Sequence, residues 1–85
     1  MTYPTEIEYS QKFMDANFCY RLVHLTEVEF KQLFPTVQSR QRLLEQREWL
    51  GGAIKLSELY QHCMLSWERE PHVLVFRRPI YDNDK

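Results

Sequence analysis

The sequence predicts one α+β domain, a four-stranded antiparallel sheet with two short helices inserted between strands 2 and 3. Strand-like apolar runs occur over residues 7–25 and 73–76, and two segments with helix start and stop signals lie between them. A chain of 85 residues is long enough for one hydrophobic core. Residues 1–6 and 81–85 are expected to be flexible tails.

The composition excludes several classes of protein. A hydrophobic fraction of 44% is too high for a disordered chain. A formal net charge of −1 gives no overall basic field of the kind that drives nucleic-acid binding. We find no signal-peptide pattern and no apolar run near the roughly 20 residues that cross a bilayer. We therefore expect a soluble intracellular protein with no membrane or nucleic-acid partner, and free thiols at Cys19 and Cys63.

Residues 7–13 and 18–25 predict a β-hairpin. Alternating apolar residues form the first run, and the turn residues Asp15 and Asn17 separate it from the second. A turn centred on residues 16 and 17 gives these cross-strand pairs: Phe13 with Tyr20, Tyr9 with His24, and Lys12 with Arg21.

The pairing of Lys12 with Arg21 is the informative feature of this register. Aromatic cross-strand pairs favour the register, whereas two like charges face to face oppose it. The conflict disappears if an anion normally lies between the two side chains. The alternatives are that both side chains splay into solvent, or that the register is off by one residue.

Helix signals follow the hairpin. Residues 26–29, Thr-Glu-Val-Glu, form a capping box, and Pro35 ends the first predicted helix. Ser39 is a second N-cap candidate, and residues 40–50 are rich in helix formers. Gly51 and the glycine after it are a stop signal, so a second helix is expected over this range.

The last predicted strand is central in the sheet. Pro71 and Pro79 bracket it, because proline offers no N–H to a sheet. The unbroken apolar run over residues 73–76 indicates burial on both faces. Arg77 and Arg78 follow, and alternation sends them to opposite faces, so only one of them can share a given site.

Catalytic and metal-binding patterns are weak. Residues 60–65 are expected to form the third strand, where His62 and Cys63 point to opposite faces and cannot form a nucleophile–base pair. The three histidines lack metal-binding spacing, and two glycines are too few for a phosphate-binding loop. We therefore expect no enzyme, no metal and no cofactor.

A binding site for a small anion is better supported. The polar and basic residues that can converge on such a ligand are Lys12, Arg21, Ser57 and Arg78. These groups match a dianionic phosphate through charge-assisted hydrogen bonds, and arginine can form two parallel bonds to it. Phosphorylated peptide motifs are recognised in this way.

Three blocks of residues resemble the Cks family, the regulatory subunits of cyclin-dependent kinases. Residues 70–79, EPHVLVFRRP, closely resemble the C-terminal signature of that family. Residues 9–13 and 18–25 fall where the family has its first two strands, and residues 48–51, EWLG, are similar to its helical Glu-Trp-Arg motif. The resemblance covers residues 7–80, almost the whole chain.

The resemblance implies a non-catalytic adaptor in cell-cycle control, acting in the cytoplasm and the nucleus. One surface of such a protein docks on the kinase, and a separate cationic pocket captures phosphothreonine on other proteins. The family's pocket corresponds by motif to Lys12, Arg21, Ser57, Tyr60 and Arg78. Its kinase contacts correspond to Phe13, Met64, Leu65, Glu68, Glu70 and His72.

The sequence departs from the family pattern in the pocket and in the third strand. Tyr60 stands where the family has tryptophan, and Leu59 replaces the glycine before it. Matching the third strand requires one extra residue, which we expect near Ser66 and Trp67. Two alternative functions remain: a Cks-fold paralogue that binds kinase but not phosphate, and a small nucleic-acid-binding module that uses the same basic residues.

The hinge before the last strand also departs from the pattern. It comprises Glu68, Arg69, Glu70 and Pro71, and Arg69 stands where the family commonly has the first of two prolines. Such proline pairs strain the hinge and set the balance between a monomer and a strand-swapped homodimer. We expect Arg69 to relax the hinge and to shift that balance.

Overall fold

The computed structural model describes residues 3–36, 38–65 and 69–80, and it has the predicted α+β architecture. Its elements are β1 (Glu8–Tyr9), β2 (Phe13–Met14), β3 (Phe18–His24), α1 (Glu27–Leu33), the 3-10 helix η1 (Gln38–Gln41), α2 (Gln46–Trp49), β4 (Gln61–Met64) and β5 (Val73–Pro79). All helical segments fall between β3 and β4, as predicted. Predictions for residues 1–2, 66–68 and 81–85 lie outside the described residues.

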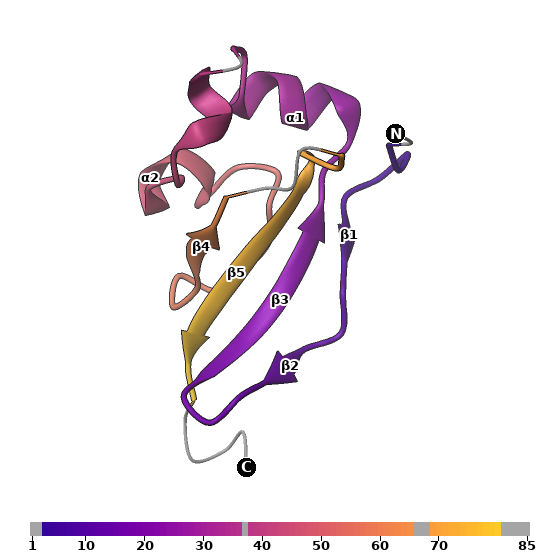
Figure 1. The fold of residues 1–85 in the computed structure, drawn as a ribbon. Coiled ribbons are helices and arrows are strands. Elements are labelled where there is room, and N and C mark those ends of the chain that lie inside the picture. Colours follow the sequence, from indigo (N-terminus) through magenta and orange to yellow (C-terminus); the bar gives the residue numbers. More distant parts are fainter. Residues whose placement is uncertain (1–2, 37, 66–68, 81–85) are drawn as a thin grey trace.

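β3 and β5 form the centre of an antiparallel sheet (Figure 1). The strand order is β1-β3-β5-β4, and β2 pairs with β3 as β1 does. β1 and β2 are therefore two pieces of one edge strand, which gives the sheet four positions. The prediction of a central last strand is confirmed, because β5 pairs on both sides and residues 73–76 are buried.

The hairpin register is only partly as predicted. Phe13 pairs with Tyr20, which confirms the expected aromatic pair. Tyr9 pairs with Val23, so the prediction that it lies opposite His24 was wrong. Strict alternation does not hold between Tyr9 and Phe13, because the edge strand carries one extra residue there.

The extra residue lies between β1 and β2, where residues 10–12 face only Arg21 and Leu22. Ser10 accommodates it through its side chain. Its Oγ accepts the Leu22 N–H at 2.8 Å, while its own N–H donates to Leu22 O at 2.9 Å. The Ser10 carbonyl is thereby released from the ladder and accepts a hydrogen bond from Arg21 Nε at 3.0 Å.

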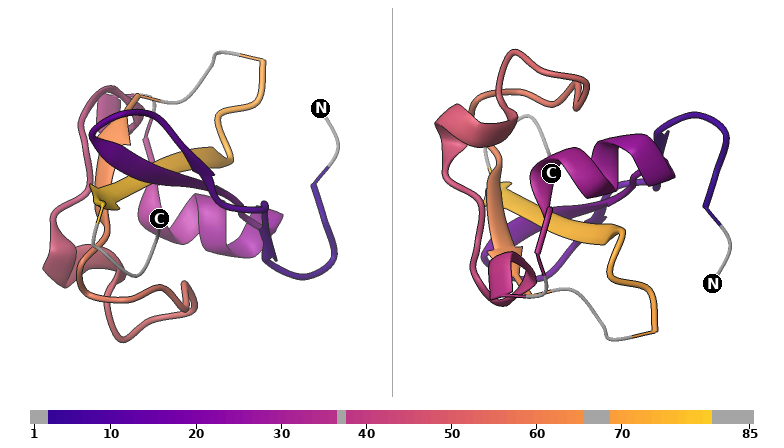
Figure 2. Two further views of the ribbon diagram at one scale, coloured as in Figure 1. Left: turned by 90° about the horizontal axis from the view of Figure 1, so that it is seen from below. Right: turned by 90° about the horizontal axis from the view of Figure 1, so that it is seen from above.

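The helices cover one face of the sheet, here called the helix face, on which Val23, Leu74 and Phe76 point into the core. Figure 2 shows α1 lying along this side of the sheet. Phe30 of α1 and Trp49 of α2 are fully buried there, and the Trp49 ring meets Phe76 edge-on at 5.1 Å. Tyr20, Val75 and Arg77 point to the opposite face, because successive strand residues alternate.

α1 begins and ends as the sequence predicted. The Glu29 N–H donates to Thr26 Oγ1 at 3.2 Å, which is the N-cap bond expected of a capping box. The helix ends at Leu33, two residues before Pro35. The neighbouring Phe34 is buried in the core.

The single helix expected over residues 40–50 is wrong, since two shorter segments, η1 and α2, take its place. Glu45 rather than Ser39 is the N-cap of α2, and its N–H donates to Glu48 Oε2 at 2.6 Å. The predicted stop is confirmed at Gly51, which has φ +82°, a conformation that glycine adopts without a steric cost.

β4 is shorter than the predicted strand over residues 60–65 and contains a β-bulge. His62 pairs with Phe76 and Met64 with Val75, so Cys63 is one extra residue with no opposite residue in the ladder with β5. His62 therefore lies on the helix face and Met64 on the opposite face. The extra residue expected near positions 66 and 67 falls outside the described part of the chain.

Candidate anion-binding site

Arg21 and Arg78 lie on the same face of the sheet. Arg21 pairs with Phe76, two residues before Arg78, so the two arginines are diagonal neighbours on the helix face. Arg77 points to the opposite face, and its guanidinium carbon lies 4.1 Å from the centroid of the Phe18 ring. The sheet thus separates the adjacent arginines, as alternation predicted.

Arg78 carries a nearly buried positive charge at the end of β5. The residue is only 8% exposed, and its Nη1 donates to Pro79 O at 3.2 Å. Its guanidinium carbon lies 5.6 Å from the centroid of the Tyr60 ring. Burial raises the pKa of the Tyr60 hydroxyl, whereas the neighbouring Arg78 opposes that rise. The Tyr60 ring thus packs beside the Arg78 guanidinium and lines that side of the site.

Arg21 is held by the edge strand. Its Nε donates to Ser10 O at 3.0 Å, and its guanidinium carbon lies 5.3 Å from the centroid of the Tyr9 ring. Within the described ranges, the two terminal Nη groups of Arg21 make no hydrogen bond. They are the groups that could bind a phosphate oxygen pair.

Ser57 begins the turn that delivers Tyr60 to the site. The Ser57 carbonyl accepts the Tyr60 N–H at 3.1 Å, and its Oγ accepts the Leu59 N–H at 3.2 Å. No described residue other than glycine has a positive φ, so Leu59 fits this turn without strain. The glycine that the family has at this position is not required for the turn.

Lys12 comes directly before β2, in the part of the edge strand that lies opposite Arg21 and Leu22. It is exposed and stands beside Phe13, whose partner Tyr20 points to the opposite face. Alternation therefore gives Lys12 the helix face, which Arg21 also occupies. The three ion pairs found among the described residues do not involve Lys12.

The residues predicted to contact a kinase fall into two environments. Phe13, Met64 and Leu65 are about half exposed. Phe13 stacks on Tyr20 at 5.5 Å, and Met64 shares the opposite face with this pair. Phe13 and Met64 are therefore exposed apolar side chains on the face opposite the helices, and Leu65 directly follows the last residue of β4.

Glu70 is exposed, whereas His72 is only 3% exposed. The His72 ring packs against Tyr3 at 4.9 Å, and its pKa is lowered chiefly by burial. In the hinge, Arg69 is exposed and Pro71 is buried, while the predicted contact and hinge residue Glu68 lies outside the described residues.

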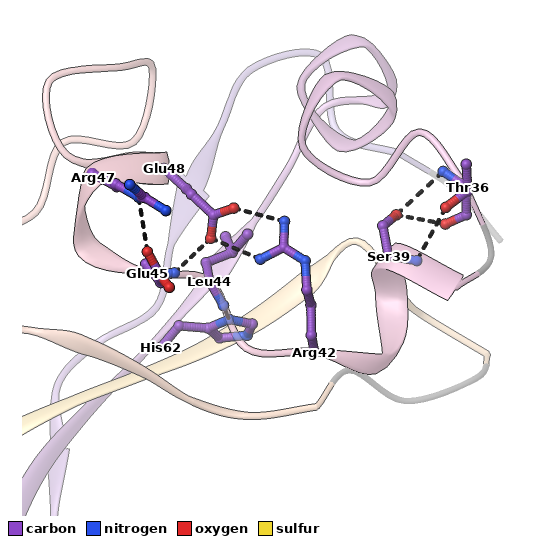
Figure 3. A network of polar contacts seen from close by, with 8 residues as sticks. All are labelled: Thr36, Ser39, Arg42, Leu44, Glu45, Arg47, Glu48 and His62. Atoms are coloured by element: carbon purple, nitrogen blue, oxygen red, sulfur yellow. Dashed lines mark hydrogen bonds and ion pairs between the residues drawn. The ribbon is translucent and has the colours of Figure 1, made fainter.

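A polar network, shown in Figure 3, fastens α2 to β4. The Leu44 N–H donates to Nδ1 of His62 at 2.8 Å. Burial lowers the pKa of His62 to about 4, so its ring is neutral and can accept this bond. Arg42 donates to both carboxylate oxygens of Glu48, at 2.6 and 2.9 Å, and holds the pKa of that carboxyl at about 2.

Sequence reasoning missed two side chains that organise this region. The sequence around His62 suggests only a possible base for Cys63, yet its ring nitrogen accepts the Leu44 N–H and fixes that part of the backbone. The pattern around Tyr9 indicates only a strand residue, yet its hydroxyl accepts the Lys55 N–H at 2.7 Å. Both contacts join residues far apart in sequence, and no local pattern signals them.

The described region gives the following findings on metal ligands, membrane-spanning helices and cysteines. It contains no group of three or more residues suited to hold a metal ion, and none of its helices is long and apolar enough to span a membrane. Cys19 and Cys63 are both free, as predicted. Burial raises the pKa of the Cys63 thiol, and its Sγ donates to Val75 O at 3.4 Å.

Fold and site together define a small α+β domain with a cationic site on one face and the exposed apolar side chains Phe13 and Met64 on the other. Residues 7–80 match the family described as cyclin-dependent kinase regulatory subunit. The chain therefore belongs to the Cks family of cyclin-dependent kinase regulatory subunits.

Relatives from distant organisms agree with this assignment. The chain is 38% identical over 77 residues to a cyclin-dependent kinases regulatory subunit of Caenorhabditis elegans, an alignment covering 91% of this chain and 76% of that protein. It is 36% identical over 74 residues to a probable regulatory subunit of Physarum polycephalum, covering 87% and 81%. It is 38% identical over 74 residues to regulatory subunit 2 of Xenopus laevis, covering 87% and 86%.

Proposed function

We propose that this chain is a non-catalytic adaptor that binds a cyclin-dependent kinase and docks phosphothreonine-containing proteins in cell-cycle control. The observation that carries the phosphate-binding part is the diagonal placement of Arg21 and Arg78 on one face of the sheet, with Arg78 beside the Tyr60 ring. The kinase-binding part is supported by the names of the relatives. The proposal locates the protein in the cytoplasm and the nucleus.

The chemistry of the pocket suits a phosphate dianion. Arg21 and Arg78 supply guanidinium donors, Lys12 supplies a third positive charge, and Ser57 supplies a hydroxyl. Hydrogen bonds to charged groups are each worth about 1.5–3 kcal/mol. Loss of one arginine should therefore weaken binding by roughly one to two orders of magnitude.

The kinase would dock on the opposite face of the sheet. Phe13 and Met64 supply exposed apolar area there, Leu65 adds a half-exposed side chain next to Met64, and the exposed carboxylate of Glu70 can contribute to a polar rim. Because the two sites use opposite faces, the adaptor can hold a kinase and a phosphorylated protein at the same time. This separation is the physical basis of the proposed adaptor role.

The test is a titration of a phosphothreonine-proline peptide and its unphosphorylated form. Wild-type protein should bind only the phosphorylated peptide, and Arg21→Ala and Arg78→Ala should each remove most of that binding. Arg77→Ala is the matched control, since it deletes the same charge on the opposite face. Arg78→Lys retains a charge at the buried position and should still lose the two-bond geometry.

Two outcomes would contradict the proposal. Equal binding of both peptides would contradict phosphate recognition. Absence of binding to either peptide, with kinase capture intact, would favour a Cks-fold paralogue that contacts the kinase alone.

A further inference from the structure

Lys55 lies beside the cationic pocket and has no part in the function proposed above. Its backbone N–H donates to the Tyr9 hydroxyl at 2.7 Å. The ring of the same Tyr9 lies against the Arg21 guanidinium, whose carbon is 5.3 Å from the ring centroid. The Lys55 backbone and the Arg21 guanidinium therefore both contact the Tyr9 side chain, so Lys55 lies close to Arg21.

The local chain directs Lys55 to the same side as Ser57. Ile54 is buried and Leu56 is half-buried, whereas Lys55 and Ser57 are both exposed. This alternation is that of an extended segment, in which residues two apart share a side. Lys55 thus joins the exposed surface to which the pocket residue Ser57 belongs.

The charge of Lys55 is not neutralised within the described structure. The ion pairs found there join Lys31 with Glu27, Arg42 with Glu48, and Arg47 with Glu45. Glu58, which follows Ser57, is the acidic residue of the same loop. The nearby positive charges of Lys55, Arg21 and Lys12 outnumber this single negative charge.

We propose that Lys55 forms a second anion subsite next to the phosphate pocket, so that the preferred ligand is a phosphorylated segment with a second negative charge close to the phosphorylated residue. This inference rests on the proposed phosphate-binding function. An extended peptide advances about 3.3 Å per residue, so a side chain one or two positions from the phosphothreonine can reach a neighbouring cation. A carboxylate and a second phosphate share the required chemistry.

The experiment compares four peptides of one length: phosphothreonine with neutral neighbours, with glutamates on both sides, with a second phosphorylated residue, and the glutamate peptide without phosphate. The wild-type chain should bind the second and third about two- to fivefold more tightly than the first, the range of an exposed ion pair. Lys55→Gln should abolish this gain and leave the affinity for the neutral phosphopeptide unchanged. The second and third peptides show which anion is preferred.

Lys31→Gln is the matched control, because it removes the same charge from α1, where Lys31 pairs with Glu27. Lys31→Gln should retain the gain in affinity from the second negative charge. A gain that persists in Lys55→Gln, or one that Lys31→Gln removes equally, would overturn the subsite and indicate a general charge effect.

Tyr9→Phe tests how Lys55 is positioned. The variant keeps the ring against Arg21 and removes the hydroxyl that accepts the Lys55 N–H. It should lose part of the gain from the second charge while it retains binding of the neutral phosphopeptide. Phosphate-dependent binding by the wild type without any gain would overturn the subsite alone, whereas no phosphate-dependent binding would overturn the proposed function as well.

Discussion

Acidification from pH 7 to pH 4 should destabilise this fold through His62. The side chain is only 5% exposed, and its Nδ1 must be unprotonated to accept the Leu44 N–H at 2.8 Å. Burial lowers the pKa of His62 from 6.5 to about 4. As the pH falls through this window, the unfolded chain binds a proton that the folded chain does not.

The linkage relation gives the sign and the size of the effect. The folded pKa is depressed, so the stabilising contribution is present above about pH 6.5 and is lost towards pH 4. The free energy of unfolding falls by up to ~1.4 kcal/mol per pH unit, which amounts to about 3 kcal/mol across the window. A domain of this size has a total stability of roughly 4–13 kcal/mol, so the loss should be easy to measure.

Urea unfolding at intervals between pH 7 and pH 4 would test this prediction, with His62→Asn as the reference. Asparagine can accept the Leu44 N–H through its side-chain oxygen but does not titrate. His72 and Glu48 are present in both proteins, so their contributions to the pH dependence of stability cancel in the difference between wild type and variant. Parallel loss of stability in wild type and variant would refute the reasoning. An NMR titration of wild-type His62 gives an independent check, and a pKa above 6 would also refute it.

Three further changes have expected outcomes. Glu48→Gln should lower the free energy of unfolding in urea by about 1 kcal/mol, since it weakens the bond to Arg42 and the N-cap of α2; the control Glu58→Gln should change it little. Gly51→Ala should cost about 1–2 kcal/mol in the same assay because φ is +82°, and Gly52→Ala should cost less. Arg69→Pro should change the ratio of monomer to strand-swapped dimer in size-exclusion chromatography with light scattering over a concentration series. A wild-type chain that is monomeric at every concentration would contradict the proposed hinge role.

Local signals predicted the parts of the fold that depend on local chemistry. Thr26 caps α1 through its own hydroxyl, and Gly51 ends α2 through its own φ, so the residue type is sufficient in both cases. The helix expected over residues 40–50 failed for the opposite reason. The Leu44 N–H bonds to His62, 18 residues away, and Glu48 caps a helix that begins only after Glu45. No sequence window around Leu44 contains that partner.

The candidate site shows the same limit. Arg21 and Arg78 could be proposed from residue type and family resemblance, and the pairing of β3 with β5 explains why they are neighbours. The contact of Tyr9 with Lys55 spans 46 residues and depends on how the loop before β4 returns to the edge strand. Neither periodicity nor charge patterning contains that information.

One extra residue in the edge strand near Ser10 and one β-bulge at Cys63 determine which side chains point to each face of the sheet. At the extra residue near Ser10, the Leu22 N–H bonds to the Ser10 hydroxyl instead of the Ser10 carbonyl. That carbonyl is then free to accept the hydrogen bond from Arg21 Nε. At Cys63, a β-bulge keeps His62 against Phe76 while Met64 emerges on the opposite face. Without the bulge, Met64 would follow the alternation of His62 onto the helix face and would no longer share the opposite face with Phe13. The separation of the cationic site from the exposed Phe13 and Met64 side chains therefore depends on two extra residues that break strict strand alternation.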